Sequence, residues 1–224
     1  MKKVLILSTL LFLSLQMKAQ KNQWELGIEG GPNCDLLFSL VEQNPIPDFN
    51  YICAITTEYK IDSIFSIKTG LSFEKMNFSG FGGYEVPPVL DQPTWNSFSY
   101  PVGIDLNYLV VPVLTKFEWG DNAKFFVNGG PYFAYLAEAH YLVADPVGSG
   151  GMHYFNSRIS NFKPYDMGAS AGFGFDIPLL KKLILDWELR FNFGLTRIIY
   201  PADNAPYNNQ SANFILGLKY ALIK

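Results

Sequence analysis

Apolar and polar residues alternate along most of the chain, with a period of two that recurs in segments separated by turn-forming residues. The clearest segment is 183–195, where odd positions carry Leu, Leu, Trp, Leu, Phe, Phe and Leu, and even positions carry Ile, Asp, Glu, Arg, Asn and Gly. Such alternation is typical of a β-strand with one face against an apolar medium and the other against a polar one. The pattern therefore predicts an all-β protein.

Eight segments share this alternation, and their connections alternate in length. The segments are 23–31, 51–60, 65–76, 105–119, 124–138, 165–177, 183–195 and 211–222. Short connections follow the second, fourth and sixth segments, whereas the other four are long and rich in Pro, Gly, Asn and Ser: 32–50, 77–104, 139–164 and 196–210. All long loops then leave one end of the molecule, and both termini lie at the other. This arrangement predicts an eight-stranded antiparallel up-and-down β-barrel.

Alternation alone does not decide which medium the apolar face contacts. A soluble secreted barrel of the lipocalin kind also has eight antiparallel strands, but it holds its apolar residues inside and binds a ligand there. Aromatic residues near the segment ends favour lipid outside, because they are expected at membrane interfaces: Trp24, Tyr51, Tyr59, Trp119, Tyr135, Tyr165 and Tyr220. We expect a transmembrane barrel with short periplasmic turns and long external loops.

With lipid outside, the charged residues of the polar face collect in the lumen. Buried charges are costly unless they are paired, so we predict a structural network of salt bridges and hydrogen bonds that fills the lumen. Its members are Glu25, Glu29, Glu58, Lys68, Glu74, Lys116, Glu118, Asp166, Asp176, Asp186, Glu188, Arg190 and Lys219. An eight-stranded barrel is just wide enough for such filling, which argues against a general porin.

Residues 1–19 have a basic start, an apolar run from Val4 to Leu15 and a small residue at Ala19, the pattern of a cleaved export signal. The sequence thus predicts one barrel domain over residues 20–224 in a bacterial outer membrane. Hydrophobic residues make up 49% of the chain and charged residues 17%, with a net charge of −3, so intrinsic disorder and nucleic-acid binding are both disfavoured.

Several short motifs resemble the PorT-like outer-membrane β-barrel family of Bacteroidetes-type envelopes. They are Ala19-Gln20, the run 27–32 (GIEGGP), the run 108–117 (YLVVPVLTKF), the run 129–132 (GGPY), the strand 166–174 and the final run 217–220 (GLKY). Val110 departs from the family, which usually has Glu there. The resemblance implies an eight-stranded outer-membrane barrel, and some members of the family look like accessory parts of a protein-secretion system.

The chain offers little enzymatic chemistry. Its two histidines, His140 and His153, lie in one predicted loop with Asp145 and Ser149. These are residue types that occur in hydrolase triads and metal sites. The glycine-rich setting of these residues favours ordinary polar loop residues, so we expect no catalytic residue, no metal site and no cofactor.

The two cysteines are open to two interpretations. Cys34 follows the first segment and Cys53 lies near the outer start of the second, so in an oxidising envelope they form a candidate disulfide; the alternative is two separate thiols.

The resulting functional hypothesis is a non-enzymatic outer-membrane barrel that contacts lipid and acts as a structural or interaction protein through its external loops, with other envelope proteins as partners. The alternatives are an accessory component of a secretion system, a soluble ligand-binding barrel and a lipid-modifying barrel enzyme.

Overall fold

The structure, a computed structural model, describes residues 23–35, 49–86, 96–144, 152–155, 162–198 and 208–222. Within these ranges the chain forms β1 (Gln23–Asp35), β2 (Phe49–Lys60), β3 (Phe65–Val86), β4 (Asn96–Trp119), β5 (Lys124–Ala144), β6 (Met152–Phe155), β7 (Tyr165–Pro178), β8 (Leu183–Arg197) and β9 (Asn208–Leu222). No helix long and apolar enough to cross a membrane occurs in these residues.

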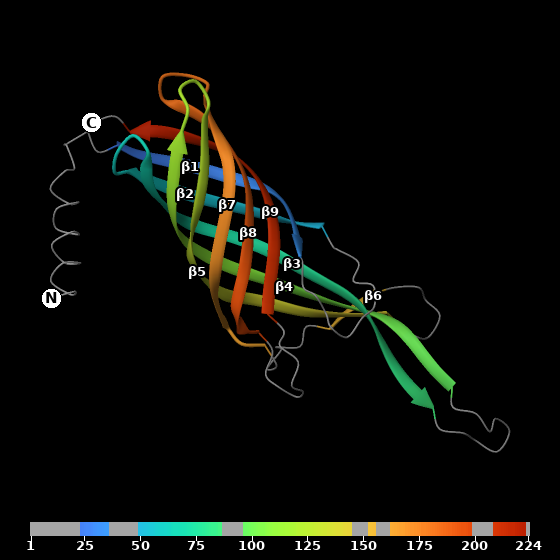
Figure 1. Cartoon of the computed structure of the whole chain (residues 1–224). Helices are drawn as coiled ribbons and strands as arrows, with labels where there is room; N and C mark the ends of the chain where they lie inside the picture. The colour runs from blue at the N-terminus through green and yellow to red at the C-terminus, as the bar shows by residue number, and fades with distance from the viewer. Residues whose placement is uncertain are drawn as a thin grey trace, which may run out of the picture.

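Eight of the strands close into an antiparallel barrel, as predicted from the alternating pattern. Strand β1 pairs with both β2 and β9, and β4 pairs with both β3 and β5, so the sheet returns on itself (Figure 1). The short strand β6 pairs with β5 alone among the described strands and stands outside the ring.

Three tight turns lie at the same end of the barrel as the start of β1 and the end of β9. The register places Gln23 opposite Lys60 and Trp24 opposite Leu222, next to the turn 61–64. In that turn Asp62 accepts backbone hydrogen bonds at 2.7 Å from the amides of Ile64 and Phe65. The turn 120–123 contains Gly120 with a φ of 107°, a left-handed conformation that glycine adopts without steric cost. We call this end the turn rim.

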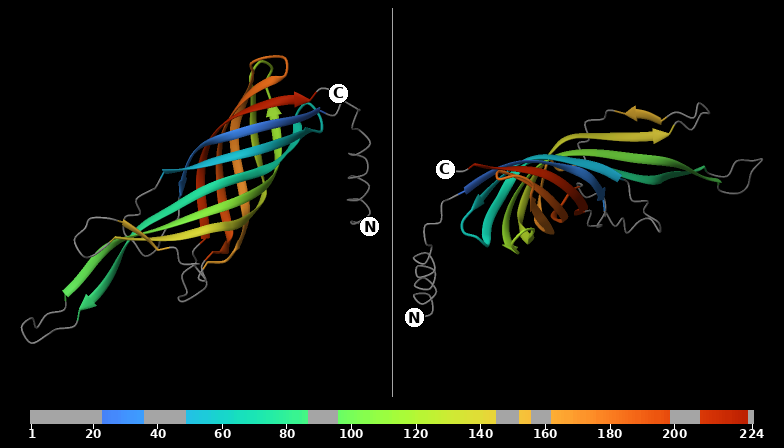
Figure 2. Two further views of the ribbon diagram at one scale, coloured as in Figure 1. Left: turned by 180° about the vertical axis from the view of Figure 1, so that it is seen from behind. Right: turned by 90° about the horizontal axis from the view of Figure 1, so that it is seen from above.

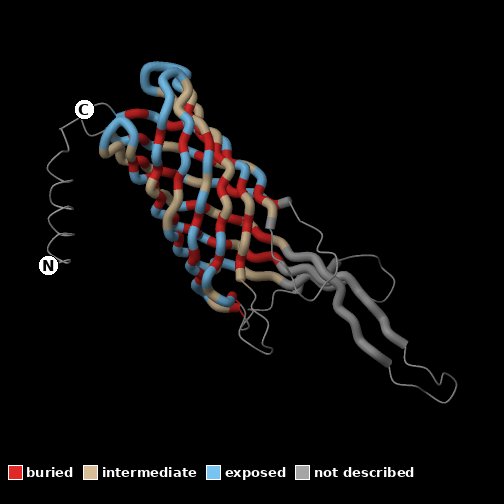
Figure 3. Tube along the Cα trace, in the orientation of Figure 1, coloured by how far each residue is buried: buried red, intermediate tan, exposed pale blue. Residues whose placement is uncertain are grey.

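The outer surface of the barrel is an apolar belt. From the turn rim to the opposite end, the outward positions of the described barrel strands carry no charged side chain until Lys75, Glu138 and Arg197 are reached. Figure 3 shows the alternation directly, with exposed and buried residues following one another along the coloured part of the barrel strands. Over 183–195 the belt is about 30 Å tall at the usual strand rise and tilt, close to the thickness of a bilayer's hydrocarbon core.

Aromatic residues border this belt at both ends. Trp24 packs against Tyr59 near the turn rim with ring centroids 4.8 Å apart, and Tyr135 packs against Tyr165 near the loop end at 5.6 Å. Soluble monomers rarely expose an apolar surface of this extent. The soluble lipocalin-like alternative is therefore wrong, because the apolar rows face outward and the charged residues face inward.

All four predicted long loops begin or end as strand, and two of them contain long strand segments. Strand β3 continues through 77–86 and pairs with 96–105 of β4, so the predicted loop 77–104 is mostly a β-hairpin. Residues 139–144 extend β5, where they pair with β4 and β6. Figures 1 and 2 show these strands projecting beyond the barrel at the end opposite the turns. We call them the loop-side extension: 77–86, 96–104, 139–144 and 152–155.

The extension escaped prediction for a local reason. Residues 78–84 read FSGFGGY, and three glycines in seven residues indicate a loop when no pairing partner is known. The antiparallel pairing with β4 supplies the missing partner. Strand β3 ends at Val86 immediately before Pro87 and Pro88, which lack the N–H that would continue the ladder.

Candidate functional site in the barrel lumen

The structure places every charged residue predicted for the lumen in the barrel interior. Each is at most 6% exposed although its side chain is ionisable: Glu25, Glu29, Glu58, Lys68, Glu74, Lys116, Glu118, Asp166, Asp176, Asp186, Glu188, Arg190 and Lys219. The period-two alternation explains this placement, because successive side chains of a strand point to opposite faces of the sheet.

The half of the lumen near the turn rim is built around two buried ammonium groups. Lys116 Nζ lies 2.7 Å from Asp176 and 2.8 Å from Glu118. Lys219 Nζ lies 2.6 Å from Asp176 and 3.2 Å from Glu58, which also accepts from Lys116 at 3.2 Å. Because β2, β4, β7 and β9 each contribute a member, these contacts tie separate parts of the wall together across the interior.

A second ion-paired group fills the middle of the lumen. Lys68 of β3 contacts Glu29 at 2.6 Å, and it reaches across to Glu188 of β8 at 2.8 Å and to Asp186 at 3.4 Å. The Arg190 guanidinium donates to both carboxylate oxygens of Glu188, at 2.6 and 2.8 Å. Bidentate pairs of this kind are among the stronger charge-assisted hydrogen bonds.

Inward-facing glycines make room for these long side chains. A Cβ at Gly217 would lie 2.7 Å from the Glu29 side chain, and one at Gly172 would lie 2.9 Å from the Glu188 carboxylate. The lumen is therefore closely packed by its own side chains, with glycine beside the long side chains of Glu29 and Glu188.

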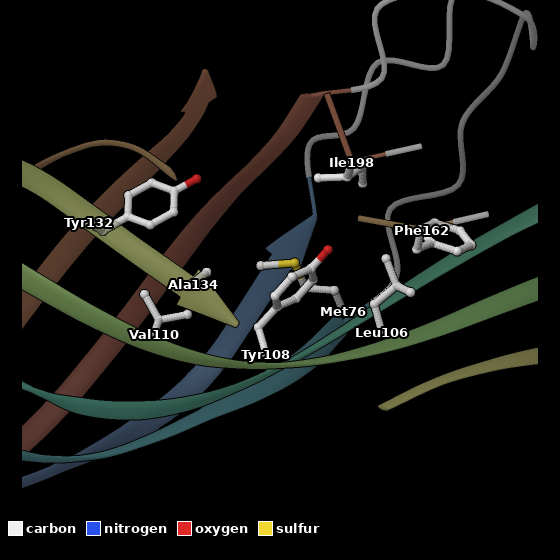
Figure 4. Close-up of a cluster of buried hydrophobic side chains, with 8 residues drawn as sticks. All are labelled: Met76, Leu106, Tyr108, Val110, Tyr132, Ala134, Phe162 and Ile198. Carbon is white, nitrogen blue, oxygen red and sulfur yellow. The ribbon is translucent and has the colours of Figure 1, made fainter. Parts of the chain in front are cut away.

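Beyond this group the lumen becomes less charged and then apolar. Glu74 accepts hydrogen bonds from Ser72 at 3.0 Å and Asn192 at 3.4 Å. Past this level lies an apolar plug, which Figure 4 shows: Met76, Leu106, Tyr108, Val110, Tyr132, Ala134, Phe162 and Ile198. Backbone hydrogen bonds Leu136 N to Pro164 O (2.8 Å) and Lys163 N to Ile198 O (2.7 Å) hold the plug's connecting segments against the wall.

Sequence reasoning missed Lys60 and the plug. Lys60 pairs with Glu58 at 2.7 Å and with Glu118, and it continues the inward series of Thr56 and Glu58, so extending that alternation by one step would have found it. The plug had no comparable signal. Leu106 and Tyr108 are apolar residues on the inward face, and Phe162 and Ile198 lie in connections.

Three lumen carboxylates, Glu58, Glu118 and Asp176, lie close enough together to resemble a metal site. The Lys116 ammonium is within 3.2 Å of all three and occupies the position that a metal ion would need. The geometry supports ion pairing at this place.

The histidines considered for a hydrolase triad or a metal site lie on different strands of the loop-side extension. His140 lies in β5, with its Nε2 3.5 Å from the exposed Glu138 carboxylate, and its register partner is Asp105. His153 lies in β6, opposite Val143. Asp145 and Ser149 fall outside the described residues, as does the predicted signal peptide.

Cys34 and Cys53 are not joined. Cys53 pairs with Gly30 and Cys34 with Phe49, so the two positions are four residues apart along neighbouring strands. That offset is about 13 Å at the rise of a strand, well beyond the Cα separation of about 7 Å that a disulfide tolerates. The candidate disulfide is wrong, and the alternative of two separate thiols is correct.

Comparison with known proteins agrees with this geometry. Residues 16–200 match the family described as "Outer membrane protein beta-barrel domain". The crystal structure of Neisserial surface protein A superimposes with a TM-score of 0.52 at 10% identity, over 88% of this chain and 96% of that one, a likeness of fold.

Two further solved structures are more distant. Ail of Yersinia pestis has a TM-score of 0.46 at 10% identity over 91% of this chain and 100% of its own. OprG of Pseudomonas aeruginosa has a TM-score of 0.42 at 12% identity over 89% of this chain and 96% of its own. No curated protein matches the chain.

Proposed function

Because the chain belongs to the outer membrane protein beta-barrel domain family, we propose that it is an integral outer-membrane protein with a structural or interaction role, carried by its loop-side extension. The apolar belt supports the membrane location, since lipid is the medium that such a surface requires. In this proposal residues 1–19 are the export signal, and N-terminal sequencing of the mature protein should begin at Gln20.

A closed lumen supports the proposal against a pore. Ion pairs span the interior from β3 to β8 and from β4 to β7, and the apolar plug lies beyond them. In a planar bilayer the purified barrel should therefore show no steady conductance. A sustained ohmic current would contradict this part of the proposal.

The extension is the single observation that carries the interaction role. Among the described strands, β2 pairs with β3 no farther than Glu74, so the part of β3 in the extension has β4 as its only strand partner there. Strand β6 ends the sheet on the other side. Open strand edges can bind an extended segment of another protein through main-chain hydrogen bonds.

The test is a cross-linking pull-down from cells, followed by mass spectrometry, with the full chain and with a variant whose 78–104 segment is replaced by a two-residue Asn-Gly turn. The variant keeps the pairing of Asn77 with Asp105 and the whole belt. We expect envelope partners that the variant loses while it still folds, as heat-modifiable gel migration would show. Identical partners for both proteins would refute a role for the extension.

A second candidate is an accessory role in a protein-secretion system. The likeness of 108–117 and 217–220 to PorT-like barrels favours it. The same pull-down separates the two roles, because the secretion hypothesis requires components of an export machinery among the captured proteins.

A further inference from the structure

The turn between β7 and β8 differs in composition from the other two turns of the turn rim. Residues 179–182 read Leu-Leu-Lys-Lys, whereas 61–64 read Ile-Asp-Ser-Ile and 120–123 read Gly-Asp-Asn-Ala. Each of the other turns carries one acidic residue and no basic one. The turn 179–182 thus combines apolar and basic side chains, which is the combination found in segments that lie at a membrane surface.

The two leucines of this turn continue the apolar belt. Leu179 is 49% exposed and Leu180 is 69% exposed, and the amides of both donate to the Leu183 carbonyl, at 2.9 and 3.1 Å. Leu183 is the register partner of Tyr220, close to the end of β9. The leucines therefore stand at the end of a surface that contacts lipid, where acyl chains can cover them.

The two lysines of the turn have no carboxylate at ion-pair distance in the part of the chain that the structure describes, and both are exposed. On the same rim, Lys60 and Lys124 both contact the Glu118 carboxylate. Carboxylates also pair with lysines elsewhere in the barrel: Lys68, Lys75, Lys116 and Lys219. The charges of Lys181 and Lys182 are thus available to an anion outside the protein.

The Lys182 ammonium lies against the outer surface of the barrel. Its Nζ is 5.7 Å from the centroid of the Tyr220 ring, which belongs to the outward face of β9 and is 46% exposed. The Ala221 amide donates to the Lys182 carbonyl at 2.8 Å and holds the turn against β9. Tyrosines at the ends of a lipid-facing surface lie at the level of the lipid headgroups, and a lysine beside one keeps its ammonium at the same level.

We propose that the turn 179–182 binds an anionic phospholipid of the adjacent leaflet, with Lys181 and Lys182 on the headgroup phosphate and Leu179 and Leu180 on the acyl chains. Two ammonium groups without internal counter-charges favour a headgroup of net negative charge over a zwitterionic one. The leucines favour a lipid over a free phosphate ion, because only the lipid supplies apolar surface. This inference rests on the proposed membrane location and is independent of the interaction role of the extension.

The test is native mass spectrometry of the folded full chain in detergent, titrated with phosphatidylglycerol, with phosphatidylcholine of the same acyl chains, and with glycerol phosphate. One basic residue near an anionic surface strengthens binding about fivefold, so the wild type should bind phosphatidylglycerol at least fivefold more tightly than phosphatidylcholine. The double variant Lys181→Gln, Lys182→Gln should reduce this preference below about twofold. Lys124→Gln is the matched control on the neighbouring turn, because Lys124 is 40% exposed but paired with Glu118; it should keep the wild-type preference.

Two further variants make the result specific to this turn. Lys181→Gln removes no contact within the described structure, so the barrel should fold as the wild type does while the preference for phosphatidylglycerol falls severalfold. Leu180→Ser should weaken the binding of both lipids and leave their ratio unchanged, because Leu180 contacts the acyl chain in either case.

Three results would overturn the lipid site. They are equal binding of the two phospholipids by the wild type, an unchanged preference in the double variant, and binding of glycerol phosphate as tight as that of phosphatidylglycerol. Failure of the wild type to insert into phosphatidylcholine vesicles, followed by heat-modifiable gel migration, would contradict the membrane location and the lipid site together. Insertion without a preference for the anionic lipid would contradict the lipid site alone.

Discussion

Replacing Lys219 with Met tests whether the lumen network stabilises the barrel. Lys219 Nζ is 1% exposed and lies within 3.2 Å of three carboxylates, at 2.6 Å from Asp176, 3.1 Å from Asp186 and 3.2 Å from Glu58. Each contact has a gross Coulomb energy of about 5–6 kcal/mol at an effective dielectric constant near 20. Desolvation of the ammonium and proton uptake by the freed carboxylates offset most of that sum, and breaking one partner of a buried pair costs about 3–5 kcal/mol net.

We therefore expect Lys219→Met to lower the free energy of unfolding by about 3–5 kcal/mol. The assay is urea unfolding in lipid vesicles, followed by tryptophan fluorescence and by heat-modifiable gel migration. Lys75→Met is the matched control, because the Lys75 side chain is 29% exposed and lies 3.5 Å from Asp105. This substitution should lower the free energy of unfolding by less than about 1 kcal/mol. Equal effects of the two substitutions would refute the claim that buried charge pairing holds the lumen together.

Three further predictions follow from the belt, a turn and the cysteines. Leu216→Lys in the belt should destabilise the barrel by about 2–4 kcal/mol in vesicle unfolding, against about 0–1 kcal/mol for Leu222→Lys at the turn rim; equal losses would argue against a depth-dependent lipid surface. Gly120→Ala should cost about 1–2 kcal/mol in the same assay because of the left-handed φ of 107°, and no loss would show that the turn relaxes. Thiol titration of the denatured, unreduced protein should find both Cys34 and Cys53 reactive, and a value near zero would reveal a disulfide.

The side of the sheet to which each barrel side chain points could be predicted from the sequence, because it depends on a local property. In 185–193 each residue differs from its neighbour in polarity, so Asp186, Glu188 and Arg190 must share one face whatever the rest of the chain does. Charge burial then follows from closure of the sheet.

The pairing of particular charges needed the three-dimensional register. Lys68 contacts Glu188, which lies 120 positions farther along the chain. This contact depends on the stagger of the eight strands, so no local sequence pattern predicts it. The plug and the extension were missed for related reasons. Phe162 and Ile198 come from connections, and 77–86 gains its strand character from pairing with β4 rather than from its own glycine-rich sequence.

Contact between the apolar belt and lipid is the central claim, and the native tryptophans test it most directly. Trp187 is opposite Leu216 and Trp24 is opposite Leu222, six residues nearer the turn rim on β9, a difference of about 10–20 Å in depth. Variants that retain a single tryptophan, with the others replaced by Phe, would be folded into vesicles of lipids brominated at different depths along the acyl chain. Trp187 should be quenched most strongly by deep bromines and Trp24 by shallow ones. If no brominated lipid quenches the emission of either tryptophan, the account is contradicted.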